Sequence, residues 1–266
     1  MSLDLLQAFY RERRLIIFIG AGVSLSIQPP NAHGTFPSWE GLVNKAADML
    51  TFSDPDLLRA RGTDLQILEY YRLRNGGDVS PLTAWLIRTM DVDEATLHTA
   101  PIYAELAAME HVSLIYTTNY DDFIERALRT HGKSVTVIAK ETDADYSQRA
   151  DFEVVKFHGD WNNPSRMVIT DSDYYARLDF RDVMDRRFSG DLLNRAVLFL
   201  GYSFRDPNIA YLFSSLKDRR LPSFITVADP ADFEYRLFRA RNIEVEGITR
   251  FHEAEGIAQL LRSIRE

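Results

Sequence analysis

The stretch Leu15-Ile-Ile-Phe-Ile-Gly-Ala-Gly-Val-Ser24 decides the fold class of this chain. Its leading apolar run predicts a strand that is buried on both faces, as in a parallel sheet. The Gly-Ala-Gly turn that follows allows a tight bend and a close approach of the backbone to a pyrophosphate group. Leu25 stands where the usual dinucleotide pattern has a third glycine, so an ordinary glycine turn remains the alternative.

Apolar runs elsewhere in the chain predict six more buried strands. They lie at Ser113–Thr117, Val135–Ile138, Glu153–Phe157, Ala196–Leu200, Phe224–Val227 and, more weakly, Ile243–Val245. Most of them are separated by stretches with helical spacing. Such alternation of strands and helices predicts an α/β fold: a Rossmann-like, mostly parallel sheet with helices on both faces.

One long stretch, residues 39–109, breaks this alternation. It has no strand pattern, and its spacing predicts helices over 39–50, 56–61, 64–74, 80–90 and 101–109. We interpret it as a small helical module inserted after the first strand–helix unit. A second helical stretch, residues 171–194, could join this module. Residues 1–266 are therefore expected to form a single domain, with the core at about 10–38 and 110–266.

Composition excludes several classes of protein and site. The 39 acidic and 31 basic side chains give a formal net charge of −8, with no basic footprint, so direct nucleic-acid binding is not expected. The chain has no cysteine, which excludes disulfides and thiolate zinc sites, and we expect no metal. It shows no secretion signal or membrane-length apolar run. A soluble cytoplasmic protein is the expectation.

Polar side chains follow two other predicted strands. Asn119 lies in Tyr116-Thr-Thr-Asn-Tyr-Asp-Asp122 and can both donate and accept hydrogen bonds. In the same motif, Asp121 or Asp122 could instead cap the next helix. His158, in Lys-Phe-His-Gly-Asp160, is suited to accept a proton near neutral pH, although a lone histidine is often structural.

The last two turns resemble each other. Gly201-Tyr-Ser203 precedes Asp206-Pro207, and Asp229-Pro230 follows the next strand; each Asp-Pro pair predicts a capped helix start. Ser203 could bind ribose or phosphate, or the turn could be an ordinary capped connection. Because parallel strands end at one edge of a sheet, all these turns are expected to meet there.

Four motifs together resemble one family. GAGVS, TTNYDD, FHGD and LFLGYSFRDPNI, in this order, resemble the sirtuin-like superfamily, and more closely its bacterial branch of NAD hydrolases in antiphage defence. The segment GTFPSWEGL, residues 34–42, is also typical of that branch. The resemblance spans about Leu15 to Asp229 and implies that NAD is the substrate.

The resemblance also implies roles for individual residues. Asn119 and His158 would be the catalytic pair beside the nicotinamide ribose. The other matching residues would bind NAD: Gly20, Ala21, Gly22 and Ser24 at the phosphates, Thr118 beside Tyr120 and Asp121 near the nicotinamide carboxamide, Gly201 and Ser203 at the adenosine half, and Asp229 at the adenine ribose.

Departures from protein-deacylating sirtuins favour water as the acceptor. The four zinc-binding cysteines are absent, and Asp171–Asn194 stands in their region. The loop after GAGVS reads LSIQPPNAHGTFPSW, and the usual Thr-Gln-Asn reads Thr-Thr-Asn. We therefore expect an NAD glycohydrolase that releases nicotinamide and ADP-ribose.

Two other functions are the alternatives: an NAD-dependent deacylase or ADP-ribosyltransferase, and a non-catalytic nucleotide-binding sensor or scaffold. An unrestrained NAD hydrolase would starve its own cell, so we expect control by a homo-oligomer or by a separate sensor protein. The amphipathic segment Leu3–Tyr10 is a candidate contact surface, unless it packs on its own domain.

Overall fold

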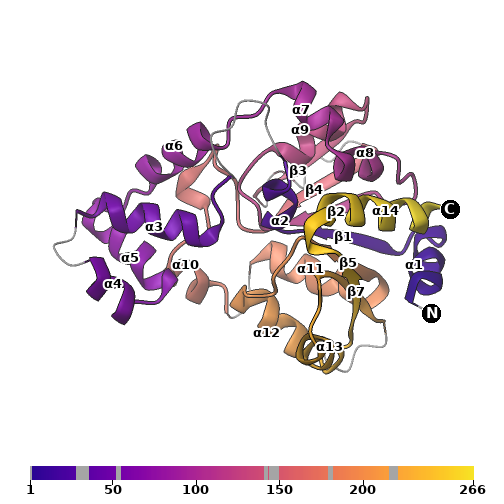
Figure 1. Cartoon of the computed structure of the whole chain (residues 1–266). Coiled ribbons are helices and arrows are strands. Elements are labelled where there is room, and N and C mark those ends of the chain that lie inside the picture. Colours follow the sequence, from indigo (N-terminus) through magenta and orange to yellow (C-terminus); the bar gives the residue numbers. More distant parts are fainter. Residues whose placement is uncertain are drawn as a thin grey trace.

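A seven-stranded parallel sheet forms the centre of the protein (Figure 1). The computed structural model describes residues 2–27, 36–51, 55–140, 143, 150–178, 182–215 and 221–266. The strand order is β3-β4-β2-β1-β5-β6-β7, and every neighbouring pair is parallel, which confirms the expected fold. The strands are β1 Leu15–Ile19, β2 Leu114–Thr117, β3 Val135–Ile138, β4 Phe152–Lys156, β5 Ala196–Leu200, β6 Ser223–Ala228 and β7 Ile243–Ile248.

The order in which the chain adds strands to the sheet switches sides at β1. It builds β2, β3 and β4 on one side of this strand and β5, β6 and β7 on the other. In open α/β sheets, ligands bind outside the carboxyl ends of the strands at such a switch point. Ile19 pairs with both Thr117 and Leu200, and Thr117 pairs with Lys156. The four central strands therefore end at the same level.

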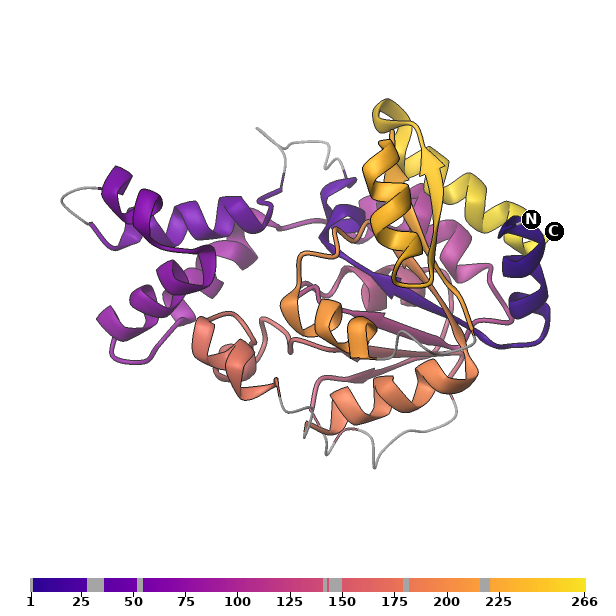
Figure 2. The same ribbon diagram turned by 90° about the horizontal axis from the view of Figure 1, so that it is seen from below.

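Helices cover both faces of the sheet. One face carries α1 Ser2–Arg11, α8 Pro101–Ala107, α9 Phe123–Thr130 and α14 Glu253–Arg265, and the other carries α11 Val183–Asn194, α12 Pro207–Ser215 and α13 Asp232–Arg239 (Figures 1 and 2). Successive β1 residues alternate between the two layers: Ile17 belongs to one apolar cluster and Phe18 to the other. Every helix in the described ranges is too short or too polar to span a bilayer.

The N-terminal helix packs on its own domain. Leu6 and Tyr10 of α1 are buried, and the Gln7 side chain donates a 2.8 Å hydrogen bond to the Ser263 carbonyl in α14. Both chain termini consequently lie side by side at the end away from the helical module (Figures 1 and 2). The apolar face of this helix is used inside the chain.

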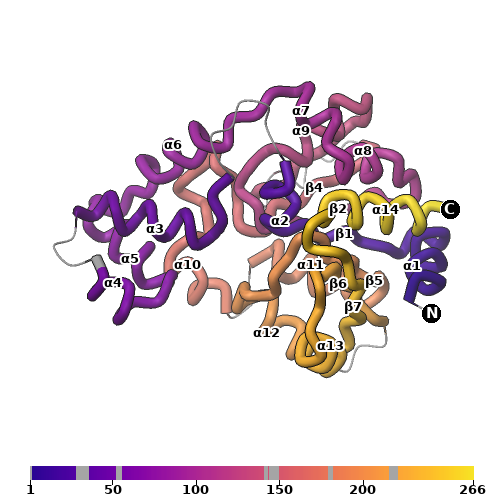
Figure 3. Tube along the Cα trace, viewed as in Figure 1, coloured from indigo at the N-terminus to yellow at the C-terminus, as the bar shows by residue number. Residues whose placement is uncertain are grey.

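The helical module stands to one side of the sheet. It contains α3 Trp39–Met49, α4 Pro55–Arg61, α5 Asp64–Arg74 and α6 Ser80–Thr89, close to the predicted bounds. The chain enters the module beyond α2 (Ala21–Leu25) and returns to the sheet at α7 (Glu94–Thr99), as the tube in Figure 3 shows. The sequence did not indicate α7, which packs with α8 and α9 over the sheet.

The segment 171–194 divides between the two parts. Helix α10, Asp171–Ala176, lies against α5 of the module. Helix α11 instead covers the sheet, where the Phe188 ring contacts Phe18, Tyr116 and Phe157. The aromatic residue near the middle of α11 therefore anchors it to the sheet rather than to the module.

Of the two predicted Asp-Pro helix starts, one is confirmed and one is wrong. Asp206 caps α12, since its Oδ1 accepts the backbone N–H groups of Asn208 and Ile209 at 2.8 and 3.2 Å. Asp229 does not cap α13, because its backbone takes a positive φ of 45° and the helix begins only at Asp232. At that start, the Glu234 carboxylate accepts the backbone N–H of Ala231 at 2.9 Å.

Candidate active site

The glycine turn after β1 packs directly against the turn after β5. The Gly22 N–H donates to the Gly201 carbonyl at 2.9 Å. A Cβ at Gly20 or Gly22 would lie 2.6 or 2.8 Å from that carbonyl oxygen, and one at Gly201 would lie 2.5 Å from the Val23 nitrogen. Gly201 also has φ 57°, a left-handed conformation that favours glycine. Contact between the two turns thus requires all three glycines.

The turn after β2 holds Asn119 by its amide nitrogen. The Asn119 side chain donates to the Gly20 carbonyl at 3.2 Å and to Ser24 Oγ at 3.0 Å. Its backbone N–H donates to Thr117 Oγ1 at 3.0 Å. The residue is only 5% exposed, and its Oδ1 has no hydrogen-bond partner among the described residues. The oxygen of this fixed carboxamide is therefore the acceptor left for a ligand.

Asp121 supports this asparagine and caps α9. Its Oδ2 accepts the Ser24 hydroxyl at 2.8 Å, and its Oδ1 accepts the Phe123 N–H at 3.2 Å. Asp122 makes no side-chain cap and instead lies 3.3 Å from Arg126. Of the two carboxylates left open by the sequence, Asp121 is the cap. Both of its oxygens are occupied within the protein.

A buried ion pair lies behind Asp121. Lys156, at the end of β4, has its ammonium 3.0 Å from Glu125 Oε1 and donates to the Asp121 carbonyl. Burial raises the pKa values of Asp121 and Glu125, and the charge of Lys156 opposes that rise. This pair could not be predicted from the sequence, because Lys156 belongs to a stretch with the pattern of an apolar strand.

His158 follows β4 and is almost fully buried, with 2% exposed. Its carbonyl accepts the Val168 N–H at 3.0 Å, and its ring meets the edge of Tyr174 with centroids 5.3 Å apart. The ring Nε2 lies 3.0 Å from Asp206 Oδ2, outside ideal hydrogen-bond alignment. Neither of these two atoms makes a well-aligned hydrogen bond with any described residue.

Strand register places the asparagine and the histidine at matching positions. Thr117 of β2 pairs with Lys156 of β4, and the Phe157 N–H donates to the Thr117 carbonyl at 2.7 Å. Asn119 and His158 each lie two residues beyond their paired strand residue. The two residues therefore follow adjacent strands, each two positions beyond a member of the same strand pair.

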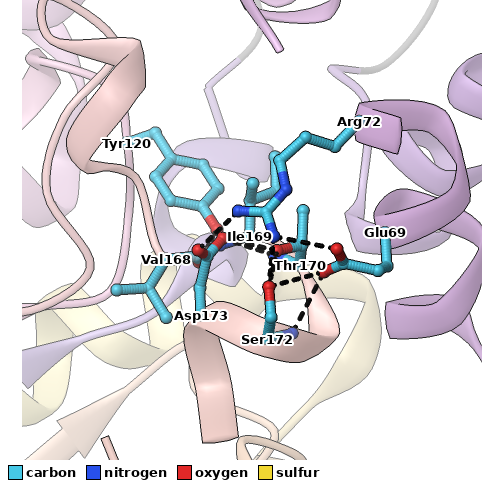
Figure 4. A network of polar contacts seen from close by, with 8 residues as sticks. All are labelled: Glu69, Arg72, Tyr120, Val168, Ile169, Thr170, Ser172 and Asp173. Carbon is cyan, nitrogen blue, oxygen red and sulfur yellow. Dashed lines mark hydrogen bonds and ion pairs between the residues drawn. The ribbon is translucent and has the colours of Figure 1, made fainter. Parts of the chain in front are cut away.

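Tyr120, in the turn between β2 and α9, contacts the loop that follows His158 (Figure 4). Its hydroxyl donates to the Val168 carbonyl at 2.7 Å. Two residues further on, Thr170 donates through its backbone and hydroxyl to Asp173, which also lies 3.0 Å from Arg72 of α5. Figure 4 shows Arg72 reaching from the module across to α10. The loop after His158 is thereby tied to the helical module.

Glu69 completes this network on the module side. It accepts hydrogen bonds from Arg72 at 2.8 Å and from the backbone and hydroxyl of Ser172 at 3.1 and 2.7 Å. Burial would raise the pKa of Glu69, but these hydrogen bonds outweigh it and lower the pKa to about 2. The carboxylate is therefore ionised at neutral pH.

The other predicted binding residues lie along the same edge without joining this network. Ala21, Ser203 and Asp229 are exposed, and Thr118 is half-buried. The Asp229 N–H donates to the Ile248 carbonyl at 2.8 Å. Part of the segment 34–42, and residues 28–35 of the loop after the glycine turn, lie outside the described residues.

Three residues of the β5–α12 turn carry polar atoms that the sequence did not single out as a site. Tyr202 and Asn208 are buried, and the Tyr202 hydroxyl and both Asn208 side-chain polar atoms lack hydrogen-bond partners among the described residues. Asp206 looked like a helix cap and also faces His158. Nowhere in the described ranges do three histidine, aspartate or glutamate side chains group to hold a metal ion.

A glycine turn at the switch point of a parallel sheet, with polar side chains beside it, defines an α/β protein of the Rossmann type. A family model described as the SIR2-like domain matches residues 113–245, half of the chain. The chain belongs to this SIR2-like family.

Individual relatives and structures are similar to this chain over much of its length. NAD(+) hydrolase ThsA of Cytobacillus dafuensis is 31% identical over 208 residues, which is 77% of this chain and 38% of that protein. Defense-associated sirtuin 2 of Bacillus subtilis is 26% identical over 218 residues, 80% of this chain and 20% of that protein. The chain thus spans well under half the length of either relative.

A solved structure shares the fold. A Sir2 homolog in complex with NAD aligns over 100% of this chain and 94% of its own, with a TM-score of 0.55 at 15% identity.

Proposed function

We propose that this chain is one catalytic domain that hydrolyses NAD to nicotinamide and ADP-ribose. The observation that carries the proposal is the position of Asn119 and His158, each two residues beyond a paired strand residue of the adjacent strands β2 and β4, beside the switch point. The names of its relatives, an NAD(+) hydrolase and a defence-associated sirtuin, support it. The buried Asn119 oxygen without a protein partner suits a ribose hydroxyl or a water.

In this reaction, the bond between ribose C1′ and the nicotinamide nitrogen breaks. The bonding electrons leave with the cationic ring, which departs as neutral nicotinamide, and positive charge develops on the ribose. Water adds to C1′ and loses one proton. No acid is needed for the leaving group, unlike the carboxylic acid that assists departure in ordinary glycosidases. The protein must orient the ribose, admit one water and accept the proton.

We assign these tasks to the two central side chains. Asn119 orients the ribose or the water through Oδ1, since its NH₂ group is held by Gly20 and Ser24. His158 accepts the proton, because an imidazole changes charge near neutral pH. The remaining NAD would run along the edge past Gly201 and Ser203, towards Asp229 at the adenine ribose.

Burial of the two side chains requires a conformational step before turnover. Asn119 is 5% exposed and His158 is 2% exposed, so the nicotinamide ribose enters only when the site opens. Such a closed resting state suits an effector of antiphage defence that must not consume NAD without a trigger. Opening would be driven by self-assembly or by a separate sensor protein, in the cytoplasm where NAD is available.

The test is to incubate the purified protein with NAD, alone and with candidate activators, and to identify the products by chromatography. Asn119→Ala and His158→Ala are expected to lower nicotinamide release by about 10²–10⁴-fold. The exposed residues Asn162 and His252 give matched controls, and Asn162→Ala and His252→Ala should keep full activity. Full activity in both site variants, or no nicotinamide release in any state, would refute the proposal.

A further inference from the structure

Asp206 is the side chain that faces the ring of His158. Its Oδ2 lies 3.0 Å from His158 Nε2, and the two side chains are 7% and 3% exposed. We propose that Asp206 is a positioning residue: it holds the imidazole ring and keeps a proton on Nε2, so that Nδ1 is the nitrogen that accepts a proton. The use of that proton in catalysis rests on the proposed function.

The contact spans the site rather than joining neighbouring elements. His158 follows β4 and Asp206 follows β5, and two strands, β2 and β1, lie between them. Strands are about 4.8 Å apart, so the two strand ends are separated by roughly 14 Å. The turns close this separation by reaching over the switch point. Two charged or polar groups that meet there are placed by the fold, not by chain proximity.

The Asp206 carboxylate is held in one orientation. Its Oδ1 accepts the N–H groups of Asn208 and Ile209 at the start of the nine-residue helix α12, which leaves Oδ2 for the histidine. Burial acts to raise the pKa of Asp206, but His158 and these two N–H groups outweigh it and lower the pKa. An ionised, fixed carboxylate accepts a hydrogen bond and cannot donate one.

A second carboxylate lies near the histidine but is already neutralised. Burial raises the pKa of Asp185 of α11, and the nearby Arg177 and His158 oppose that rise. Both Asp185 oxygens bind the Arg177 guanidinium, Oδ2 at 3.3 Å from Nε. Among the described residues, no lysine or arginine lies within ion-pair distance of Asp206. Tyr174 of α10 also contacts the histidine, and its ring meets the imidazole edge-on. Asp206 is therefore the acceptor that sets the ring.

This arrangement fixes which nitrogen of His158 is basic. A neutral imidazole has one N–H donor and one lone pair, and the acceptor beside one nitrogen decides the tautomer. With Asp206 at Nε2, the proton stays there and the lone pair is on Nδ1. A carboxylate in this place also stabilises the imidazolium that forms when Nδ1 takes up a proton.

Asp206→Asn tests the assignment with little change in shape. The amide oxygen can still cap α12, while the NH₂ group faces Nε2 and favours a proton on Nδ1. ¹⁵N NMR of the histidine rings reports the tautomer directly, and His158→Asn identifies the signal among six histidines. We expect the wild type to carry the proton on Nε2 and the variant to carry it on Nδ1. This reading needs no enzymatic activity.

Kinetics provide the second readout. Asp206→Asn is expected to lower kcat for NAD hydrolysis by about 10²–10⁴-fold, with KM nearly unchanged, since only proton acceptance is affected. Asp93→Asn is the matched control, because Asp93 caps α7 in the same way: its Oδ1 accepts the Thr96 N–H at 2.7 Å. This variant changes no contact of His158 and should keep full activity. Asp206→Ser keeps a capping oxygen, and its thermal unfolding separates loss of the cap from loss of the histidine contact.

Each outcome decides the assignment. Unchanged ¹⁵N signals together with full kcat in Asp206→Asn would overturn the role of Asp206. An Asp206→Asn variant more active than the wild type would also overturn it, because the Asp206–His158 contact would then restrain opening of the site. If the wild type releases no nicotinamide in any state, the proposed function fails while the NMR result still stands for or against Asp206.

Discussion

Gly201→Ala tests the packing of the two glycine turns on which the site is built. Gly201 has φ 57°, and an added Cβ would lie 2.5 Å from the Val23 backbone nitrogen. The left-handed conformation costs an L-residue about 1–2 kcal/mol, and alanine recovers about 0.4–1 kcal/mol by restricting the unfolded chain. Overpacking against backbone adds about 1–3 kcal/mol. The free energy of unfolding should therefore fall by about 3 kcal/mol.

Gly132→Ala is the matched control for this substitution. Gly132 also has a positive φ, 75°, but a Cβ there would meet nothing within 4 Å. Only the conformational cost remains, so the expected loss is about 1 kcal/mol. Urea unfolding followed by circular dichroism measures both variants, and an unchanged m-value shows that the stability itself has changed. Equal losses in the two variants would refute the claim that turn–turn contact requires Gly201.

Two further predictions concern buried and half-buried charges. Lys156→Met leaves Glu125 buried without its cation and should lower the free energy of unfolding by about 3–5 kcal/mol at neutral pH. The double variant Lys156→Met/Glu125→Leu should recover most of this stability in urea unfolding. If it recovers none, loss of the ion pair is not the cause. Glu69→Gln should destabilise the protein at neutral pH. The pKa of Glu69 is lowered from 4.5 to about 2 in the folded protein, so its contribution to stability is complete above pH 4.5 and is lost as the pH falls towards 2. The free energies of unfolding of wild type and variant should therefore converge over that interval. A difference that stays constant with pH would contradict stabilisation by hydrogen bonds to the ionised carboxylate.

The sheet could be predicted from the sequence because its strands are short apolar runs with a clear stop. β1 and β5 have the predicted bounds, because Gly20 and Gly201 directly follow the apolar runs and terminate the strands. Helix α7 was missed because it has only six residues and one buried side chain, Leu97, too little to show a period. The pattern also indicated a helical stretch over Asp171–Asn194. It did not show that the stretch divides into two helices, or which surface each of them covers.

Only the site residues that directly follow predicted strands could be predicted from the sequence. Asn119 and His158 stand directly after apolar runs, so a parallel sheet brings them to one edge. The second role of Asp206 could not be seen, because an aspartate before proline has the same sequence pattern whether it caps a helix, faces a histidine or does both. Lys156 and Glu125 are likewise joined only by the fold.

Two sets of contacts of unequal strength hold the histidine in its closed surroundings. On one side, Asp206 belongs to the turn whose Gly201 is locked to Gly22 by buried backbone contact. On the other side, the segment after His158 is held to the module through Arg72 and Asp173, whose side chains are 26% and 24% exposed. Partly exposed ion pairs contribute little to stability, whereas displaced buried backbone groups lose their hydrogen bonds. Opening of the site therefore costs less by movement of the α10 segment than by movement of the glycine turns.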